Sequence, residues 1–253
     1  TVFFLWMNDH FVIIVPARAG STRLPNKPLA LINGKTLINR IITLAKSSDA
    51  SEVYIATDDL EIRKHSESHG AQVVMTSPDH ISGMDRVAEA ANTLKLDLGT
   101  PIVNLQGDEP FMPLEILNTL PKFLNSDTPI ATACIKFKDI NQVKNQHEVK
   151  VVRSLSNKAM YFSRSPIPNE FTQNYDNYLK HLGIYAYTNH TLQKLSRLKV
   201  SANEQQEKLE QLRFLDNGFN IYVQDFKCES PIGIDTPEDL IAANKFAEIH
   251  DTI

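Results

Sequence analysis

Up to residue 105, four short apolar runs alternate with longer stretches in which apolar residues recur every three to four positions. The apolar runs lie at residues 11–15, 53–56, 72–75 and 101–105. Because these runs are apolar on both faces, we expect them to be parallel strands buried between two layers of helices. The stretches between them predict helices at residues 37–48, 60–69 and 85–96. This alternation predicts a doubly wound, mostly parallel sheet of the α/β class.

The second half of the chain follows a different pattern. Apolar segments at residues 130–137, 148–152 and 182–187 predict strands, and the loops around them are rich in Asn, Pro and Ser. We therefore expect a smaller mixed-sheet insertion, followed by helices at residues 204–216 and 237–249. Because no repeat or long linker is present, residues 7–253 are predicted to form a single domain. The change of pattern divides it into parts at about 7–130 and about 131–225, with a closing helix in 226–253.

The net charge of −4 argues against a surface built as a whole to hold nucleic acid or an anionic membrane. The two cysteines, Cys134 and Cys228, lack the spacing of a zinc site, so we expect buried thiols in the reducing cytoplasm. The apolar residues 1–6 are too few for a signal peptide or a membrane span. We expect Met7 to be the natural start and residues 1–6 to be an upstream extension.

The segment 16–30, directly after the first predicted strand, contains three cations and no acid: Arg18, Arg23 and Lys27. Main-chain N–H groups at residues 20–22 can approach a phosphate, and the three side chains can neutralise its oxygens. A solvated basic loop is the alternative interpretation. Ligands of doubly wound sheets bind beyond the carboxyl ends of the strands, so the position of the loop favours an anion site.

Two aspartates are candidate metal ligands. Asp108, within Gln106-Gly-Asp-Glu-Pro110, follows a buried strand and should lie at the same sheet edge as the basic loop. A carboxylate there is the hard oxygen ligand that Mg²⁺ prefers when it also binds phosphates, although a polar turn explains the same residues. Asp235 precedes a helix start in which Thr236 is the expected N-cap. That helix start leaves the role of Asp235 unexplained.

Seven motifs follow the basic loop in the order found in a known family. They are Ala56-Thr-Asp-Asp59, Ser82-Gly-Met-Asp-Arg86, Asn104-Leu-Gln-Gly-Asp-Glu-Pro110, Tyr161-Phe-Ser-Arg164, His181-Leu-Gly-Ile-Tyr185, Leu209-Glu-Gln-Leu-Arg213 and Gly233-Ile-Asp-Thr-Pro-Glu-Asp239. With the loop they resemble the 3-deoxy-manno-octulosonate cytidylyltransferase family of sugar nucleotidyltransferases, and the resemblance covers nearly the whole chain. It implies transfer of CMP from CTP to 3-deoxy-D-manno-octulosonate (Kdo) with Mg²⁺, for lipopolysaccharide synthesis, by an enzyme that is typically a homodimer.

The resemblance makes about 7–130 the nucleotide-binding part and about 131–225 the sugar-binding and dimerisation part. It also implies roles for single residues. Its catalytic residues are Arg18 and Lys27, which would hold the triphosphate, and Asp108 and Asp235, which would bind Mg²⁺. The nucleotide would lie against Ala17, Arg18, Arg23, Lys27, Ser82, Gly83 and Gln106. The sugar acid would be held by a bidentate fork from Arg164 to its carboxylate and by hydrogen bonds from its hydroxyls to His181, Tyr185, Glu210 and Gln211. Composition alone makes Arg164 an edge charge and places Glu210 and Gln211 on the exposed face of a helix.

Two segments depart from the family pattern. Met84 stands where the family usually has threonine, and methionine lacks the hydroxyl, so nucleotide preference or local packing should differ. Residues 145–148 replace a segment that commonly contains Asn-Pro. We expect the nearby Lys150 to be structural or to face a dimer partner. The apolar stretch 182–187 fits either a dimer contact or the core.

The sequence leaves rival functions open. An 8-amino analogue of Kdo or a sialic acid as acceptor would keep the reaction class and change the substrate. A non-catalytic nucleotide-binding regulator would keep only the fold, but both candidate metal carboxylates, Asp108 and Asp235, are present. A dehydrogenase-like domain is disfavoured because GxGxxG does not follow the first predicted strand. No side chain stands out as a general base.

Overall fold

The computed structural model describes residues 10–20, 23–80, 82–169 and 177–251. The expectations about residues 1–6 and about the main chain of Ser21 and Thr22 lie outside these residues. Within the described part of the chain, no helix has the length and apolar character needed to cross a membrane.

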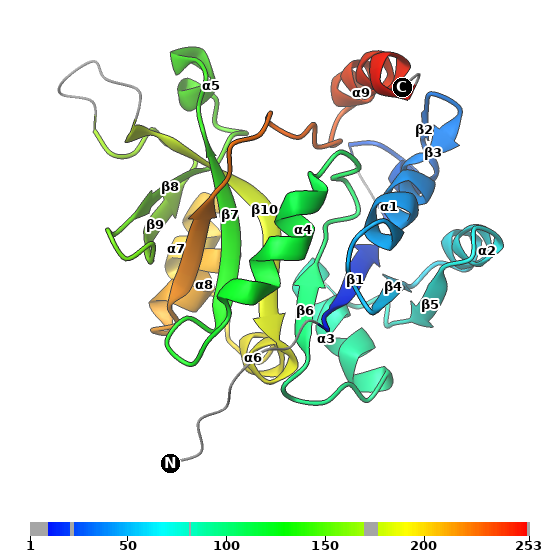
Figure 1. The fold of residues 1–253 in the computed structure, drawn as a ribbon, viewed down its shortest axis with the longest axis horizontal. Coiled ribbons are helices and arrows are strands. Elements are labelled where there is room, and N and C mark those ends of the chain that lie inside the picture. Colours follow the sequence, from blue (N-terminus) through cyan, green and yellow to red (C-terminus); the bar gives the residue numbers. More distant parts are fainter. Residues whose placement is uncertain (1–9, 21–22, 81, 170–176, 252–253) are drawn as a thin grey trace.

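A nine-stranded sheet forms the centre of the molecule (Figure 1). Its strands are β1 (Val12–Ala17), β4 (Glu52–Thr57), β5 (Gln72–Met75), β6 (Pro101–Asn104), β7 (Ile130–Lys136), β8 (Lys150–Arg153), β9 (Ala159–Ser163), β10 (Leu179–Thr188) and β11 (Ile221–Asp225). The main path runs in the order β11-β7-β10-β6-β1-β4-β5, while β8 pairs with β10 and β9. A separate ribbon consists of β2 (Leu31–Ile32) and β3 (Lys35–Thr36).

The predicted α/β class is confirmed. Strands β6, β1, β4 and β5 are parallel, whereas β10 runs antiparallel to both of its main neighbours, β6 and β7. The strands of the second half do not build a sheet of their own. They extend the central sheet, and only β8 and β9 leave its main path, as an antiparallel hairpin.

Helices cover both faces of the sheet (Figure 1). One face packs against α1 (Leu37–Lys46), α4 (Leu114–Thr119) and α9 (Pro237–His250). The other packs against α3 (Gly83–Thr93), α6 (Asn189–Leu195) and α8 (Gln211–Asp216). Along β1, Ile13 faces the first layer and Ile14 the second, as the two-residue period of a strand requires. The remaining helices and turns are η1 (Lys27–Leu29), α2 (Leu60–Ser68), η2 (Leu120–Phe123), α5 (Ile140–Lys144) and α7 (Ala202–Glu207).

The prediction of a single helix at residues 204–216 is wrong, because the structure has two helices there, α7 and α8. Between α7 and α8, Lys208 adopts φ 56° and ψ 44°, in the left-handed region. Arg213 therefore pairs with Glu204, at 2.6 Å, and not with Glu207 or Glu210. The break places Glu210 at the start of α8 and removes it from any continuous exposed helical face.

The apolar stretch 182–187 belongs to the core and not to a dimer contact. It lies in β10, between β6 and β7 in the middle of the sheet. Its apolar side chains, including Leu182, Ile184 and Ala186, are at most 3% exposed. A segment surrounded on every side by its own chain is not accessible to a second copy.

Loops from distant parts of the sequence meet at one edge of the sheet. The carboxyl ends of β1, β4 and β6 point the same way because these strands are parallel. In antiparallel β10, Tyr185 lies opposite Asn104, so His181 and Gly183 lie beyond the carboxyl end of β6. The start of β10 therefore joins the loops that follow β1 and β6, at the edge where the sequence predicted the site.

Candidate active site

A cavity of about 560 Å³ opens at this edge of the sheet. All fourteen predicted site residues line it: Ala17, Arg18, Arg23, Lys27, Ser82, Gly83, Gln106, Asp108, Arg164, His181, Tyr185, Glu210, Gln211 and Asp235. His80, Arg86, Val149, Gly183, Lys208 and Leu209 line it as well. One concave site therefore collects the residues expected to hold a nucleotide, a metal and a sugar acid.

The centre of the cavity is an ion-pair cluster. The Lys27 ammonium lies 2.8 Å from Oδ2 of Asp108 and 2.9 Å from Oδ1 of Asp235. The Arg23 guanidinium lies 3.1 Å from the same Asp235 oxygen. Burial alone would raise the pKa of Asp235, but the bonds and charges of Lys27 and Arg23 outweigh burial and lower it. For Lys27, burial would lower the pKa, and the two carboxylates together raise it.

Local backbone structure brings the two aspartates together. Asp235 directly precedes α9, where Thr236 accepts a hydrogen bond from the N–H of Asp239 and the Asp239 carboxylate accepts from the N–H of Thr236, forming the predicted capping box. The same carboxylate accepts from the N–H of Asp235, at 3.0 Å. The N–H of Ile234 donates to the carbonyl of Asp108, at 2.9 Å, and so ties the start of α9 to the loop after β6.

The arrangement of oxygens fits a divalent cation that also binds phosphate. Oxygens of Asp108 and Asp235 converge on one ammonium, so they can converge on a metal ion, and carboxylate oxygens are the ligands that Mg²⁺ prefers. Among the described residues, no group of three or more His, Cys, Asp or Glu could hold a metal. Two protein carboxylates, completed by phosphates and water, are what Mg²⁺ commonly uses at nucleotide sites.

A third carboxyl group, that of Glu109, is buried behind the two aspartates. Burial, together with the charge of Asp108, raises its pKa to about 8. Its Oε2 has no hydrogen-bond partner, and a Cβ added at Gly233 would come within 3.1 Å of its Oε1. Gly233 thus leaves room for a largely neutral Glu109 against the segment that carries Asp235.

The predicted base-binding side consists of the start of α3 and the end of β1. Ser82 is the N-cap of α3, and its hydroxyl accepts the N–H of Asp85 at 3.1 Å. A Cβ on Gly83 would lie 3.3 Å from Pro16 and 3.4 Å from the Gln106 amide oxygen, so this glycine allows close packing. A side chain at residue 83 would press on Pro16 and Gln106, which themselves line the cavity.

The departure at Met84 concerns packing. Its side chain is 2% exposed and belongs to the core on the α3 face of the sheet. It does not line the cavity. The sequence predicted either an altered nucleotide preference or altered packing. The buried position of Met84 supports altered packing beneath α3 and gives no support to an altered contact with the base.

His80 and Arg86 line the cavity although the sequence did not assign them a role. Arg86 is 2% exposed and donates to the Thr76 hydroxyl at 2.5 Å and to Asp58 at 3.1 Å. His80 is paired with Glu89. Arg86 lies in the Ser82-Gly-Met-Asp-Arg86 motif, so the sequence marked the segment but gave no reason to select the arginine.

Arg164 does not present an open guanidinium fork to the cavity. Its Nε donates to the carbonyl of Glu207 at 2.8 Å, and its Nη1 donates to the carbonyl of Gln146 at 3.0 Å. Its main-chain N–H donates to the Glu207 carboxylate at 2.9 Å. In this arrangement Arg164 ties its own segment to two others, which the sequence could not reveal because Gln146 and Glu207 are distant in the chain.

Lys150 supports the same wall from inside. Its side chain is fully buried. Its ammonium donates to the carbonyls of Asn145, Glu148 and Arg164, the longest of these bonds being 3.0 Å. Burial lowers its pKa, which the charge of Glu148 partly opposes. The structural role expected for Lys150 is confirmed, and its burial inside the chain excludes the alternative of a dimer-facing side chain.

The polar groups predicted to bind sugar hydroxyls are buried. Burial lowers the pKa of His181 to about 3, so its imidazole is neutral at pH 7, and it shares a hydrogen bond of 2.9 Å with the Thr132 hydroxyl. Burial raises the pKa of Glu210, although a hydrogen bond with the Ser82 hydroxyl and the charge of Arg213 act to lower it. The Tyr185 hydroxyl and Oε1 of Glu210 lack hydrogen-bond partners. Buried polar atoms without partners are costly, so this wall is ready to receive a polar ligand.

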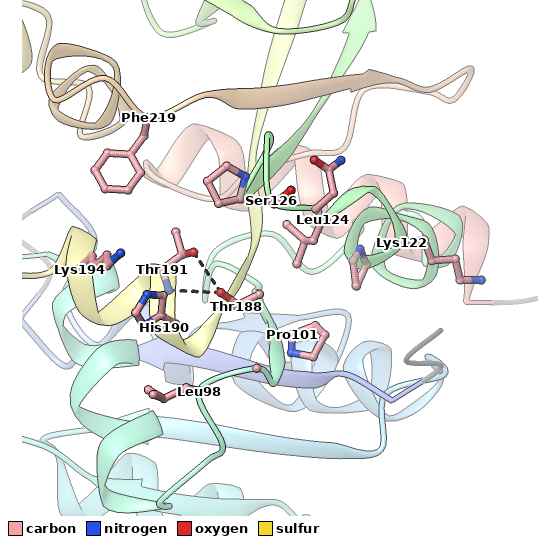
Figure 2. A pocket seen from close by; sticks show the side chains of 14 residues that line it. Leu98, Pro101, Lys122, Leu124, Ser126, Thr188, His190, Thr191, Lys194 and Phe219 are labelled. Carbon is pink, nitrogen blue, oxygen red and sulfur yellow. Dashed lines mark hydrogen bonds between the residues drawn. The ribbon is translucent and has the colours of Figure 1, made fainter. Parts of the chain in front are cut away.

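A second cavity, of about 490 Å³, lies at the opposite edge of the sheet (Figure 2). Pro101 at the start of β6 and Thr188 at the end of β10 contribute to it, and the Thr188 and Thr191 hydroxyls bond to each other at 3.0 Å. None of the predicted site residues lines it. The second cavity is therefore separate from the predicted site.

Known proteins are similar to this chain over most of its length. A family model described as cytidylyltransferase matches residues 12–225. A 3-deoxy-manno-octulosonate cytidylyltransferase of Polynucleobacter necessarius subsp. necessarius (strain STIR1) is 43% identical over 235 residues, covering 91% of this chain and 92% of that protein. One of Francisella tularensis subsp. holarctica (strain LVS) is 41% identical over 245 residues, covering 94% and 98%.

A solved structure extends the similarity to three dimensions. It is that of CMP:2-keto-3-deoxy-manno-octonic acid synthetase complexed with CTP. It matches with a TM-score of 0.87 and 38% identity, covering 94% of this chain and 98% of the other. This chain is thus a nucleotidyltransferase and belongs to the cytidylyltransferase family, with 3-deoxy-manno-octulosonate cytidylyltransferases among its relatives.

Proposed function

We propose that this protein transfers CMP from CTP to Kdo and releases pyrophosphate, activating the sugar acid for lipopolysaccharide synthesis. The observation that carries the proposal is the single cavity in which a basic loop, two convergent carboxylates and a wall of buried polar groups meet. Relatives named for this reaction cover more than nine-tenths of the chain, and the matching solved structure is a complex with CTP.

The nucleotide side of the cavity would act by positioning and charge stabilisation, which dominate phosphoryl-transfer catalysis. Arg18, exposed at the rim, and Lys27, deeper in the cavity, would hold the triphosphate and stabilise the departing pyrophosphate. Asp108 and Asp235 would hold Mg²⁺, which supplies charge neutralisation at the phosphates and favours ionisation of the attacking hydroxyl. We propose Mg²⁺ as the resident cation because both aspartates offer hard oxygen ligands.

The acceptor side would select a polyhydroxy acid. The neutral imidazole of His181 and the hydroxyl of Tyr185 can exchange hydrogen bonds with sugar hydroxyls, and Glu210 can accept them. Arg164 keeps the wall in place through its carbonyl contacts. The anomeric hydroxyl would attack the α-phosphate in line with the departing pyrophosphate, because the two ligand sides share one cavity.

Kdo is favoured over its rivals as the acceptor. The Polynucleobacter and Francisella relatives carry the name of the Kdo-specific activity. An 8-amino analogue or a sialic acid would keep the same nucleotide chemistry and change only contacts at the wall formed by His181, Tyr185 and Glu210. The acceptor comparison below separates these substrates.

We also propose a homodimer in the cytoplasm. The hairpin of β8 and β9 carries Leu155, which is fully exposed, and Met160, which is 64% exposed. Among the strands that the structure describes, β9 pairs with β8 alone, and its free edge beside exposed apolar side chains supports a contact between two copies. Cys134 and Cys228 are both free thiols, which supports a reducing compartment.

The decisive experiment measures pyrophosphate release with CTP and Mg²⁺, offering Kdo, 8-amino-Kdo or N-acetylneuraminate. Asp108→Asn should abolish release, whereas Asp127→Asn, which breaks a surface ion pair with Lys158 away from the cavity, should not. Release with Kdo in the wild type and not in Asp108→Asn supports the proposal. Release with another acid alone would show that this acid, and not Kdo, is the acceptor. No release with any acid would refute the enzymatic assignment for these substrates. Addition of EDTA should stop the reaction.

A further inference from the structure

The Lys27 ammonium occupies the position between the two carboxylates that are proposed to hold metal. It lies 2.8 Å from Oδ2 of Asp108 and 2.9 Å from Oδ1 of Asp235, and its side chain is only 13% exposed. Arg23 adds a second cation, 3.1 Å from the same Asp235 oxygen. Both carboxylates are therefore already neutralised by the protein itself.

A metal ion and this ammonium compete for the same two carboxylate oxygens. Mg²⁺ binds oxygens at about 2.0–2.1 Å, so an ion bridging Asp108 and Asp235 would lie close to the Nζ of Lys27, which contacts the same atoms. Like charges at such a distance in a partly buried site repel strongly. Metal binding at these oxygens is therefore weakened for as long as the ammonium remains between them.

A phosphate held by the basic loop would give the displaced ammonium a new partner. Lys27 begins the short turn η1, whose main chain is fixed by the N–H of Leu29 donating to Asn26 and the N–H of Ala30 donating to Lys27. The four-carbon side chain can move while this backbone stays in place, since lysine is a flexible, compact point charge. Arg18 and Arg23 line the same part of the cavity, so a triphosphate attracted to them comes within reach of Lys27.

We propose that Lys27 occupies the metal site of the nucleotide-free enzyme and moves to the phosphates when the nucleotide enters, so that the metal binds with or after the nucleotide. The inference rests on the proposed function in that it takes Asp108 and Asp235 as the metal ligands. It assigns Lys27 two successive partners, the carboxylates first and the phosphates second. The nucleotide-free enzyme should consequently bind divalent cations weakly, although both of its carboxylates are correctly placed.

The test measures metal binding without nucleotide or acceptor. Mn²⁺ is titrated into the purified full chain, and the free ion is followed by its electron paramagnetic resonance signal. Lys27→Met removes the competing charge and keeps the side-chain length, so it should bind Mn²⁺ about tenfold or more tightly than the wild type. Arg23→Gln should have a smaller effect, because Arg23 contacts only one carboxylate and its side chain is 55% exposed.

Two control variants make the result specific. Lys158→Met removes an ammonium paired with Asp127 away from the cavity, so it tests whether a change in net charge alone matters, and its Mn²⁺ affinity should equal that of the wild type. The double variant Lys27→Met/Asp108→Asn should lose the gained affinity. Lys27→Gln serves as a second neutral substitution if Lys27→Met fails to fold, with folding checked by circular dichroism.

Equal Mn²⁺ affinity in the wild type and in the folded Lys27 variants would overturn the inference. So would tight binding by the nucleotide-free wild type. Neither result depends on turnover, because the titration contains no CTP and no sugar acid. Failure of the proposed CMP transfer would appear only in the pyrophosphate assay, so the two failures can be told apart.

Discussion

Gly107 is the point at which the loop after β6 passes closest to the end of β1. A Cβ added at this residue would lie 2.6 Å from the main-chain oxygen of Pro16 and 3.9 Å from the Cα of Ala17. Non-bonded heavy atoms ordinarily approach to about 3.5 Å, so Gly107→Ala must separate the two segments by about 0.9 Å. The obstacle is backbone in the central sheet, and no side-chain rotation can relieve it.

The expected penalty follows from this overlap. Overpacking of a close-packed region costs about 1–3 kcal/mol, which for a protein of this size lowers the melting temperature by about 2–12 °C. The separation also displaces Ala17 and Asp108, on opposite sides of the contact. Because small displacements of positioning groups weaken catalysis strongly, kcat/KM for CTP should fall at least about tenfold.

Gly183 offers a matched control on the same cavity. A Cβ added there meets nothing within 4 Å, so Gly183→Ala should leave the melting temperature unchanged. Thermal unfolding by circular dichroism and pyrophosphate release with CTP measure the two effects. If Gly107→Ala melts within about 1 °C of the wild type and retains its turnover, the argument from close approach is wrong.

Three further substitutions test separate parts of the structure. Burial lowers the pKa of His181 from 6.5 to about 3, so the unfolded chain takes up a proton that the folded one refuses, and stability should be lost as pH falls from 6.5 towards 3. Urea unfolding should show about 2 kcal/mol lost from this source by pH 5, and His181→Asn should lose less. Met84→Thr should destabilise the fold by about 1–3 kcal/mol without changing the preference for CTP over UTP, and an altered preference would contradict its buried position. Arg164→Gln should raise the KM for the acceptor but not for CTP, and equal increases in both would show that the wall is not specific to the acceptor side.

The elements that the sequence predicted correctly have local determinants. Strand β1 is apolar on both faces because both are covered by helices. Helix α1 begins after Thr36, whose side chain accepts the N–H of Asn39, and α9 begins with the capping box that its sequence predicted. The carboxyl edge of the parallel strands then fixed where the site had to lie.

The features of the second half that the sequence did not predict depend on distant contacts. Strand β11 lies in a segment that the sequence left unassigned, and it is stabilised by pairing with β7, about ninety residues earlier. The break at Lys208 overrides a good helical pattern, because its carbonyl and that of Glu207 are held by Arg164. For the same reason, the sequence placed Lys27 near Asp108 and Asp235 but could not show that it bonds to both.

Four cations that line the cavity already have partners in the protein, and this bears on how the cavity binds its ligands. Lys27 and Arg23 are engaged by carboxylates, Arg86 by Asp58, and Arg164 by main-chain carbonyls. Binding of a phosphate to Lys27 or Arg23 is therefore an exchange of partners. Its free energy is the difference between that of the new contact and that of the contact given up. An anion with several charges can bind Lys27 and Arg23 together and so replace both of their ion pairs with Asp235. An anion with a single charge replaces one of these ion pairs and leaves the other. This difference favours a triphosphate over a monophosphate before any metal is bound, and it would help CMP-containing product leave a site that had held CTP.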